Sequence, residues 1–204
     1  MRKWYLWLAV LSFSFSTFAE DTINLTNGEW PPYLSEQLPE NGFASAVVRE
    51  SLNAVGMNVR YGYYPWKRAY LYAKNGADLD GTVWHGSVVW LKTKERAQHI
   101  FYADPIVIEE SVLYFLKSNP INWKEITDLQ GLLIGGTKHT VYQRLEEAQK
   151  QGILTIDRAG YYDILFDRLL ARRIDAVPRV RKVANYFLQQ SYPQAIRDKI
   201  AHSE

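Results

Sequence analysis

The sequence contains no cysteine among its 204 residues, which excludes disulfide-stapled folds and the common cysteine-ligated zinc sites. An excess of one charge is also missing, because 24 lysines and arginines face 22 aspartates and glutamates, a formal net charge of +2. Proteins that bind the phosphate backbone of nucleic acids carry a clear basic excess, so we expect no nucleic-acid partner. The hydrophobic share of 47% supports a buried core, and the length suits one large or two small domains.

An uncharged apolar stretch occupies residues 4–18, behind the basic pair Arg2 and Lys3. It is shorter than the roughly 20 apolar residues that a membrane-spanning helix needs, and several serines interrupt it. Ala19 follows as a small residue where a signal peptidase would cut. The pattern predicts a signal peptide at residues 1–19 and a periplasmic location. The alternative is a transmembrane anchor.

The rest of the chain alternates predicted strands and helices in two blocks. In the first block, strands are expected at residues 23–26, 57–63 and 82–84, with helices at 43–55 and 65–74. Crossover helices between strands imply a parallel sheet. In the second block, strands are expected at residues 111–116, 132–134, 153–156 and 174–177, with helices at 123–129, 141–151, 161–172 and 183–190. Thr140 and Gln143 are interpreted as a capping box.

Residues 103–110 join the two blocks as a predicted strand-like crossing. The sequence therefore predicts an α/β protein with a first lobe at residues 20–108 and a second lobe at 109–204. A short crossing allows the lobes to rock as rigid bodies.

Aromatic residues make up 14% of the chain, and two aromatic segments are candidate ligand sites. The loop that carries Trp30 and Tyr33 follows the first strand, where ligands gather in open α/β sheets. The run at residues 61–66 ends with Trp66 at a strand-to-helix turn and could form a stacking wall. The alternative in both cases is that these rings cover the core.

Two polar segments are candidate anion sites. Thr93 precedes Arg96 by three residues, and an arginine can grip a carboxylate through two parallel hydrogen bonds. The alternative is a solvated charged face. The glycine-rich turn at residues 135–140 lacks the spacing of nucleotide-binding loops, so no nucleotide cofactor is expected.

Signatures of catalysis are absent from the sequence. The four histidines show no metal-ligand spacing, and no nucleophile motif occurs. Glu109 and Glu110 are adjacent in an extended crossing, so their side chains should point to opposite sides and form no carboxylate pair. We expect neither an enzyme nor a metal site.

Five segments occur in an informative order. They are the Trp-Pro-Pro-Tyr loop, Thr-x-x-Arg, the Phe-Tyr-Ala-Asp-Pro of residues 101–105, the Asp-Leu-x-Gly of 128–131 and the Arg-Ile-Asp-Ala-Val of 173–177. With them the chain resembles the bacterial extracellular solute-binding proteins of family 3, the periplasmic amino-acid receptors of ABC transporters. The resemblance implies a type II periplasmic-binding-protein fold whose lobes close by a hinge near residues 107–111.

The resemblance also implies roles for individual residues. Trp30 corresponds to an aromatic plate over the ligand, and Arg96, supported by Thr93, to the carboxylate-binding arginine. Thr140 corresponds to a further carboxylate contact in the second lobe. With Tyr33 and Trp66, these residues form the predicted ligand site of a monomeric protein that captures a small, polar, carboxylate-bearing, amino-acid-like solute for an inner-membrane permease or sensor.

Three departures from the family pattern are visible. Val180 stands where an aspartate binds the ammonium of amino acids, which disfavours an ordinary amino-acid ligand. His139 replaces a glycine of the second-lobe turn. The chain also lacks the segment that completes the first lobe in relatives, so we expect a C-terminally truncated protein whose first lobe is incomplete and exposes apolar surface.

Two other functions stay open. An enzyme on the same fold, such as a cyclic-carboxylate dehydratase, would need Glu29 or Glu110 as an acid–base group in the cleft. A sensory or partner-binding module that has lost transport would tolerate the valine at position 180 and the missing segment.

Overall fold

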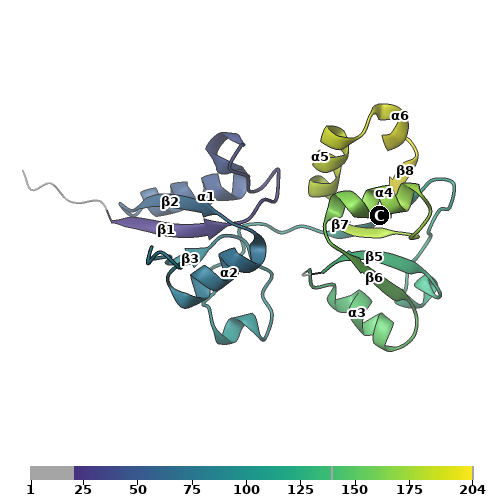
Figure 1. Cartoon of the computed structure of the whole chain (residues 1–204), viewed down its shortest axis with the longest axis horizontal. Helices are drawn as coiled ribbons and strands as arrows, with labels where there is room; N and C mark the ends of the chain where they lie inside the picture. The colour runs from purple at the N-terminus through teal and green to yellow at the C-terminus, as the bar shows by residue number, and fades with distance from the viewer. Residues whose placement is uncertain (1–20, 139, 204) are drawn as a thin grey trace, which may run out of the picture.

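The computed structural model describes residues 21–138 and 140–203. Two lobes lie side by side along the long axis of the molecule, and a single segment runs between them (Figure 1). The predicted signal peptide and His139 lie outside the described residues. Within the described part, no helix has the length and apolar character needed to cross a membrane.

The first lobe is a three-stranded parallel sheet with the order β2-β1-β3, as the alternating pattern predicted. Gly76 ends α2 in the left-handed conformation, as a C-terminal glycine should. The elements are β1 (Thr22–Asn27), η1 (Pro39–Asn41), α1 (Phe43–Asn53), β2 (Asn58–Tyr63), α2 (Trp66–Asn75), β3 (Gly86–Ser87) and η2 (Arg96–Gln98).

The strand predicted at residues 82–84 is wrong. Thr82 and Trp84 are held by Asp78, whose carboxylate accepts the backbone N–H of Thr82 at 2.9 Å and the indole N–H of Trp84 at 3.0 Å. These bonds close a turn at residues 79–80, and an isolated bridge joins Val83 to Ala77 across it. The strand that pairs with β1 comes slightly later, as β3.

The second lobe combines parallel and antiparallel strands. β5 and β6 are parallel, β4 lies antiparallel between β7 and β8, and the bridge from Ile134 to Ala176 joins the two groups. The elements are β4 (Ser111–Leu116), η3 (Ile126–Leu129), β5 (Leu133–Thr137), α3 (Gln143–Lys150), β6 (Thr155–Ala159), α4 (Tyr162–Leu170), β7 (Val177–Val180), α5 (Arg181–Ser191), α6 (Gln194–Arg197) and β8 (Ile200–His202).

Strand β4 forms because its side chains are apolar on both faces. Val112, Tyr114 and Leu116 pack against α4 and α5, while Leu113 and Phe115 pack on the opposite side of the sheet. A continuous apolar run of this kind is typical of a strand covered on both faces. Figure 1 shows α4 and α5 on one side of the second-lobe strands and α3 on the other.

Other second-lobe predictions need correction. The capping box of Thr140 and Gln143 is wrong, because Tyr142 precedes α3 and its side chain makes no capping hydrogen bond. The helix at 123–129 is only the short η3, and the crossing at 103–110 contains no strand. The predicted strands at 153–156 and 174–177 shift to the bounds of β6 and β7, while α6 and β8 were not expected.

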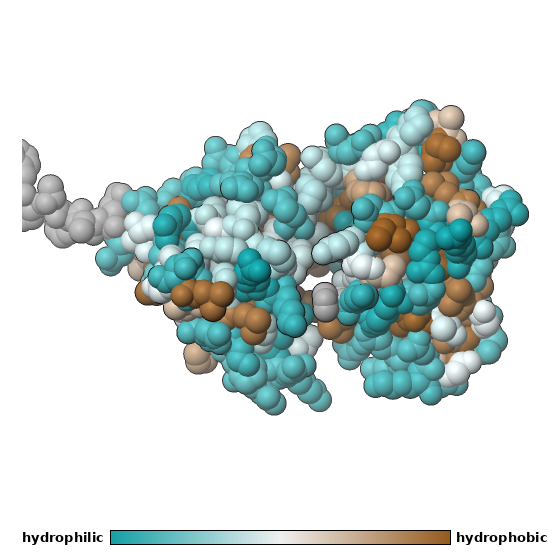
Figure 2. Space-filling model, viewed as in Figure 1, coloured by the Kyte–Doolittle hydropathy of each residue, from teal (hydrophilic) through white to brown (hydrophobic). Residues whose placement is uncertain are grey.

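A cluster of apolar residues joins the two lobes. Val183, at the start of α5 and 1% exposed, packs with Tyr33, Leu34 and Ala44 of the first lobe. Val180 borders the same cluster. The lobes are therefore in direct contact, and the space-filling view shows the surface notched between them on one side (Figure 2).

Several apolar side chains of the first lobe are exposed. The most exposed are Leu79 at 92%, Phe101 at 106% and Ile108 at 89%. Solvent contact of such side chains is costly when they are contiguous.

Candidate functional site

The turn after β1 holds two of the predicted site residues together. The backbone N–H of Trp30 donates to the carbonyl of Leu34 at 2.7 Å, and that of Tyr33 donates to the carbonyl of Trp30 at 3.0 Å. The Trp30 and Tyr33 rings consequently lie 4.9 Å apart between centroids, inclined by 35°. This turn presents a partly exposed indole backed by a buried phenol ring.

Tyr33 is 5% exposed, and its hydroxyl donates to the carboxylate of Glu109. Lys182 of α5 lies 3.0 Å from the same carboxylate. Tyr33 thus connects the first lobe to the crossing and the second lobe, and its hydroxyl is already engaged.

Trp66 lies at the first position of α2, against the end of β1. Its indole N–H donates to the carbonyl of Glu29 at 3.2 Å, and its ring lies over Gly28, where a Cβ atom would overlap it. The ring also meets Trp90 edge to face, with centroids 5.1 Å apart. Trp90, which the sequence analysis missed, connects Trp66 to the arginine described next.

Arg96 begins the short helix η2, where its backbone N–H donates to the hydroxyl of Thr93 at 3.2 Å. Its guanidinium carbon lies 4.8 Å from the Trp90 ring centroid and 5.8 Å from that of Tyr70. One guanidinium N–H donates to the carbonyl of Leu91 at 3.0 Å. Across the described residues, no carboxylate lies within 4.0 Å of Arg96, so its remaining donors have no ionic partner.

Thr140 belongs to a separate hydroxyl cluster of the second lobe, defined as the side chains of Thr137, Thr140, Tyr142 and Tyr162. The Thr140 hydroxyl lies 2.5 Å from that of Thr137 and 3.3 Å from that of Tyr162. The Tyr142 and Tyr162 hydroxyls are 3.2 Å apart. The structure thus brings Trp30, Tyr33, Trp66, Thr93 and Arg96 together in the first lobe and places Thr140 in the other.

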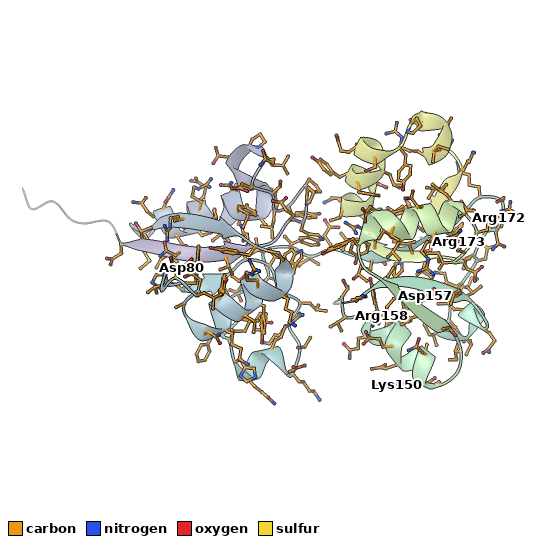
Figure 3. All side chains as sticks on the ribbon, in the orientation of Figure 1. Asp80, Lys150, Asp157, Arg158, Arg172 and Arg173 are labelled. Carbon is orange, nitrogen blue, oxygen red and sulfur yellow. The ribbon has the colours of Figure 1, made fainter. Side chains whose placement is uncertain are left out.

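Arg158 of β6 fixes the turn that carries Thr140. It donates to the backbone carbonyls of Thr137 at 2.7 Å and Thr140 at 3.1 Å, and it pairs with the carboxylate of Glu146. In Figure 3 Arg158 lies on the side of the second lobe that faces the first. The charge of Arg158 is therefore balanced inside its own lobe.

Arg179 of β7 was not among the predicted site residues. Its guanidinium carbon lies 3.4 Å from the centroid of the Tyr162 ring, a close cation–π contact. Its Nε and Nη1 atoms are buried and have no hydrogen-bond partner among the described residues. Burial lowers the pKa of Arg179 to about 10 and raises that of Tyr162 to about 12. The sequence signal was the arginine beside Val180, where the family carries an acid.

The two candidate acid–base residues are both on the surface. Glu29 is exposed, and its carboxylate accepts the backbone N–H of Glu36 at 3.0 Å. The Glu110 side chain is 74% exposed, whereas that of Glu109 is 13% exposed, so the neighbours do point to different surroundings. Within residues 21–138 and 140–203, no three metal-ligating side chains are grouped to hold an ion.

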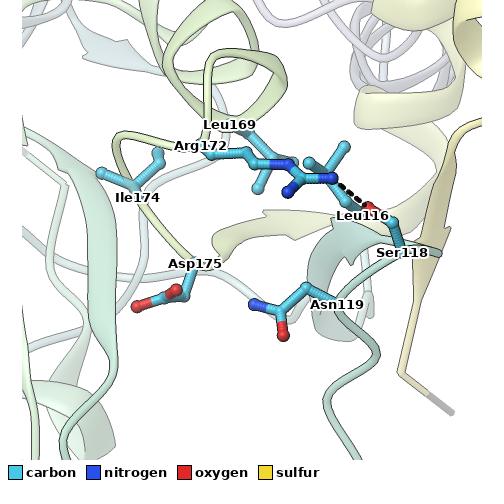
Figure 4. Close-up of a pocket in the computed structure, with 7 residues that line it drawn as sticks. All are labelled: Leu116, Ser118, Asn119, Leu169, Arg172, Ile174 and Asp175. Atoms are coloured by element: carbon cyan, nitrogen blue, oxygen red, sulfur yellow. Dashed lines mark hydrogen bonds between the residues drawn. The ribbon is translucent and has the colours of Figure 1, made fainter.

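A cavity of about 180 Å³ lies elsewhere in the second lobe. Arg172 borders it and donates to the Ser118 hydroxyl at 3.3 Å (Figure 4). Figure 3 places Arg172 at the outer end of the lobe, away from the first lobe. This cavity contains none of the predicted site residues.

The arrangement of the chain is that of known solute-binding proteins. An ancestral arginine-binding protein bound to arginine superposes with a TM-score of 0.67 at 18% identity, covering 90% of this chain and 78% of that chain. The chain has the type II periplasmic-binding-protein fold. The predicted fold class is thereby confirmed.

Two further structures with the type II fold extend the comparison. An ancestral amino acid-binding protein described as a precursor of cyclohexadienyl dehydratase has a TM-score of 0.62 at 16% identity, covering 90% of this chain and 77% of that chain. The substrate-binding protein of an amino acid ABC transporter from Streptococcus pneumoniae, bound to L-arginine, has a TM-score of 0.64 at 16% identity, covering 89% and 74%. No protein-family model and no curated protein sequence matches the chain.

Proposed function

We propose that this protein is a periplasmic solute-binding protein that captures a small carboxylate-bearing solute for an ABC transporter. The observation that carries the proposal is Arg96, a guanidinium that lies against the neighbouring Trp90 and Tyr70 rings with no carboxylate partner in the described residues. Proteins of the same fold are named for amino acid binding, and one of them serves an ABC transporter.

The geometry supports a separate role for each site residue. Arg96 binds the carboxylate through its free N–H groups, and Thr93 fixes the start of the helix that carries it. Trp30 and Trp66 provide apolar surface for the rest of the solute. Thr140 contacts the solute from the second lobe after closure, and Tyr33 supports Trp30 from beneath.

A binding role also fits the positions of the acidic residues. A catalytic carboxyl group works best when its surroundings shift its proton affinity and keep water out. Glu29 and Glu110 are exposed, and Glu29 is engaged by a backbone N–H. The structure therefore gives the dehydratase alternative no specific support.

Export and partners are part of the proposal. Residues 1–19 direct the chain to the periplasm, where it acts as a monomer. The lobes close around the crossing near residues 107–111, and the closed form docks on an inner-membrane permease or, alternatively, a sensor protein.

Isothermal titration tests the proposal. The chain without residues 1–19 is titrated with carboxylates, amino acids and short peptides, and the Arg96→Met variant is titrated with each solute that binds. We expect Arg96→Met to lose at least tenfold in affinity, since a charged bidentate contact disappears.

Arg60→Met is the matched control. Arg60 also belongs to the first lobe and lies 5.6 Å from the Trp84 ring centroid, but it lies outside the proposed site. Its variant should bind like the parent. A folded protein that binds no carboxylate, or binding that survives Arg96→Met, would contradict the proposed function.

A further inference from the structure

The hydroxyl cluster of the second lobe has one O–H proton that the contacts within the cluster do not use. Its four hydroxyl groups supply four O–H protons, and three hydroxyl–hydroxyl contacts use three of them. The Tyr142 oxygen also accepts the backbone N–H of Thr137 at 3.1 Å. One O–H proton therefore has no acceptor among the described residues.

Arg179 adds two further donors that have no acceptor in the described part of the chain. It contacts the Tyr162 ring face, while its Nε and Nη1 donors are unsatisfied. A buried charge without a hydrogen-bonded partner is costly, and a cation–π contact returns only about 2 kcal/mol. Protein stability does not explain why this position carries arginine, so a role in binding is the better explanation.

The strand register places Arg179 near the ligand-facing end of the second lobe. Arg179 is opposite Val112 and on the same face of β7 as Val177, beneath the start of α4. Thr137 ends the neighbouring β5, so both residues lie at the ends of strands that open toward the first lobe. Ligands collect at this edge of α/β sheets.

Asp163 is an acidic residue whose charge acts on Arg179, but it lies beyond ion-pair distance. Arg158 is paired with Glu146, Lys182 with Glu109, and Arg181 lies 3.9 Å from Glu110. None of the ion pairs in the described residues includes Arg179. Val180, next to it, offers no acid for an ammonium group.

We infer that the second lobe binds a second acidic group of the solute, so that the natural ligand is a dicarboxylate without an ammonium group. One carboxylate binds Arg96 in the first lobe, and the other takes the surplus O–H donor of the hydroxyl cluster above Arg179. This inference rests on the proposed function and specifies its substrate class. Arg179 attracts the second carboxylate by charge, and the hydroxyls of Thr140 and Tyr162 contact it.

The test uses matched pairs of ligands. The chain without residues 1–19 is titrated with the linear dicarboxylates from succinate to adipate, each paired with the monocarboxylate of the same chain length, and with L-glutamate and L-arginine. We expect at least one dicarboxylate to bind tenfold or more tightly than its monocarboxylate partner, and more tightly than both amino acids.

Two variants test which residues cause the preference for a dicarboxylate. Arg179→Met should remove the preference for the dicarboxylate and leave the affinity for the monocarboxylate within about twofold. Tyr162→Phe retains the ring over Arg179 but removes the hydroxyl, and it should weaken dicarboxylate binding several-fold. Arg179→Met should melt at or above the parent temperature without ligand, because it removes a buried unpaired charge. If that variant fails to fold, Tyr162→Phe alone decides.

The outcomes separate the two proposals. Equal affinity for paired ligands, tighter binding of an amino acid, or a dicarboxylate preference that survives in the variants overturns the inference, while dependence on Arg96 preserves the proposed function. Binding that does not depend on Arg96 overturns the proposed function instead.

Discussion

Lys182 and Glu109 form an ion pair, with Nζ 3.0 Å from Oε1, that joins helix α5 to the crossing between the lobes. The Tyr33 hydroxyl donates to the same carboxylate from the first lobe. A single acidic side chain thus links three parts of the chain at the predicted hinge. Its neighbour Glu110 is largely exposed and makes only a distant contact with Arg181.

The two contacts of Glu109 should contribute different amounts to the free energy of unfolding. Lys182→Met should cost no more than about 1 kcal/mol in free energy of unfolding, because the Lys182 side chain is 69% exposed. Tyr33→Phe should cost about 1.5–3 kcal/mol, because it removes a hydrogen bond to a largely buried carboxylate. Urea unfolding of both variants checks the order, and Glu110→Gln is the control. A larger loss of stability for Lys182→Met than for Tyr33→Phe would contradict this ranking.

Gly62 is predicted to be intolerant of a side chain. A Cβ atom at this position of β2 would overlap the Trp84 ring. Gly62→Ala should lower the free energy of unfolding by about 1–3 kcal/mol, as overpacked cores do. Gly160→Ala is the matched control, since no atom lies within 4 Å of its added Cβ. If denaturant titration shows equal stability for both variants, the close packing of the Trp84 ring on Gly62 is refuted.

Alkaline pH should destabilise the fold through Tyr114. Burial raises the pKa of this phenol from 10.0 to about 12, while Arg181 and Arg179 oppose the shift. The unfolded chain loses the proton near pH 10 and the folded chain retains it. Stability present below pH 10 is therefore lost as the pH rises through about 12, by at most about 3 kcal/mol for this group.

Tyr114→Phe measures this contribution. The variant loses hydrogen bonds to the Arg181 carbonyl at 3.1 Å and to Asn185 at 2.9 Å, so it starts less stable. Its stability should nevertheless fall less steeply between pH 10 and pH 12 than that of the parent, as measured by urea unfolding at several pH values. An unchanged slope would show that other groups dominate the alkaline loss.

Val180→Asp should alter ligand choice. The family resemblance puts an ammonium-binding acid at this position, and the substitution supplies one beside the cluster that contains Trp30. Affinity for L-arginine should rise about tenfold or more, which corresponds to about 1.4 kcal/mol. Val180→Asn, which is similar in size and uncharged, is the control. If calorimetry shows the same affinity for the parent and both variants, position 180 does not belong to the ligand site.

The sequence predicted elements well where the local pattern and the tertiary environment agree. Strand β4 is apolar on both faces and was located at its observed bounds. Residues 82–84 misled the prediction because the side chain of Asp78 binds Thr82 and Trp84, and such a turn leaves no periodic pattern. Strand β8 contains three residues and exists through its pairing with β4, which is invisible to local propensity.

The candidate site shows the same contrast. Trp30, Trp66 and Arg96 were identified by their place in motifs, and the structure puts them in one lobe near one another. Trp90 and Arg179 were missed. The sequence showed only that Arg179 stands beside Val180, and it placed Trp90 in no motif. The importance of both depends on which rings and donors surround them in three dimensions.

The burial of Val183 against the first lobe affects how the two lobes can move in the proposed closure. Its side chain belongs to one lobe but is buried against Tyr33 and Leu34 of the other. In the proposed lobe closure, atoms near this apolar contact should move least and atoms at the far rims of the lobes should move most. In the proposed closure, the distance between spectroscopic labels on the exposed Lys94 and Lys150 should change, whereas labels next to Val183 should keep their separation.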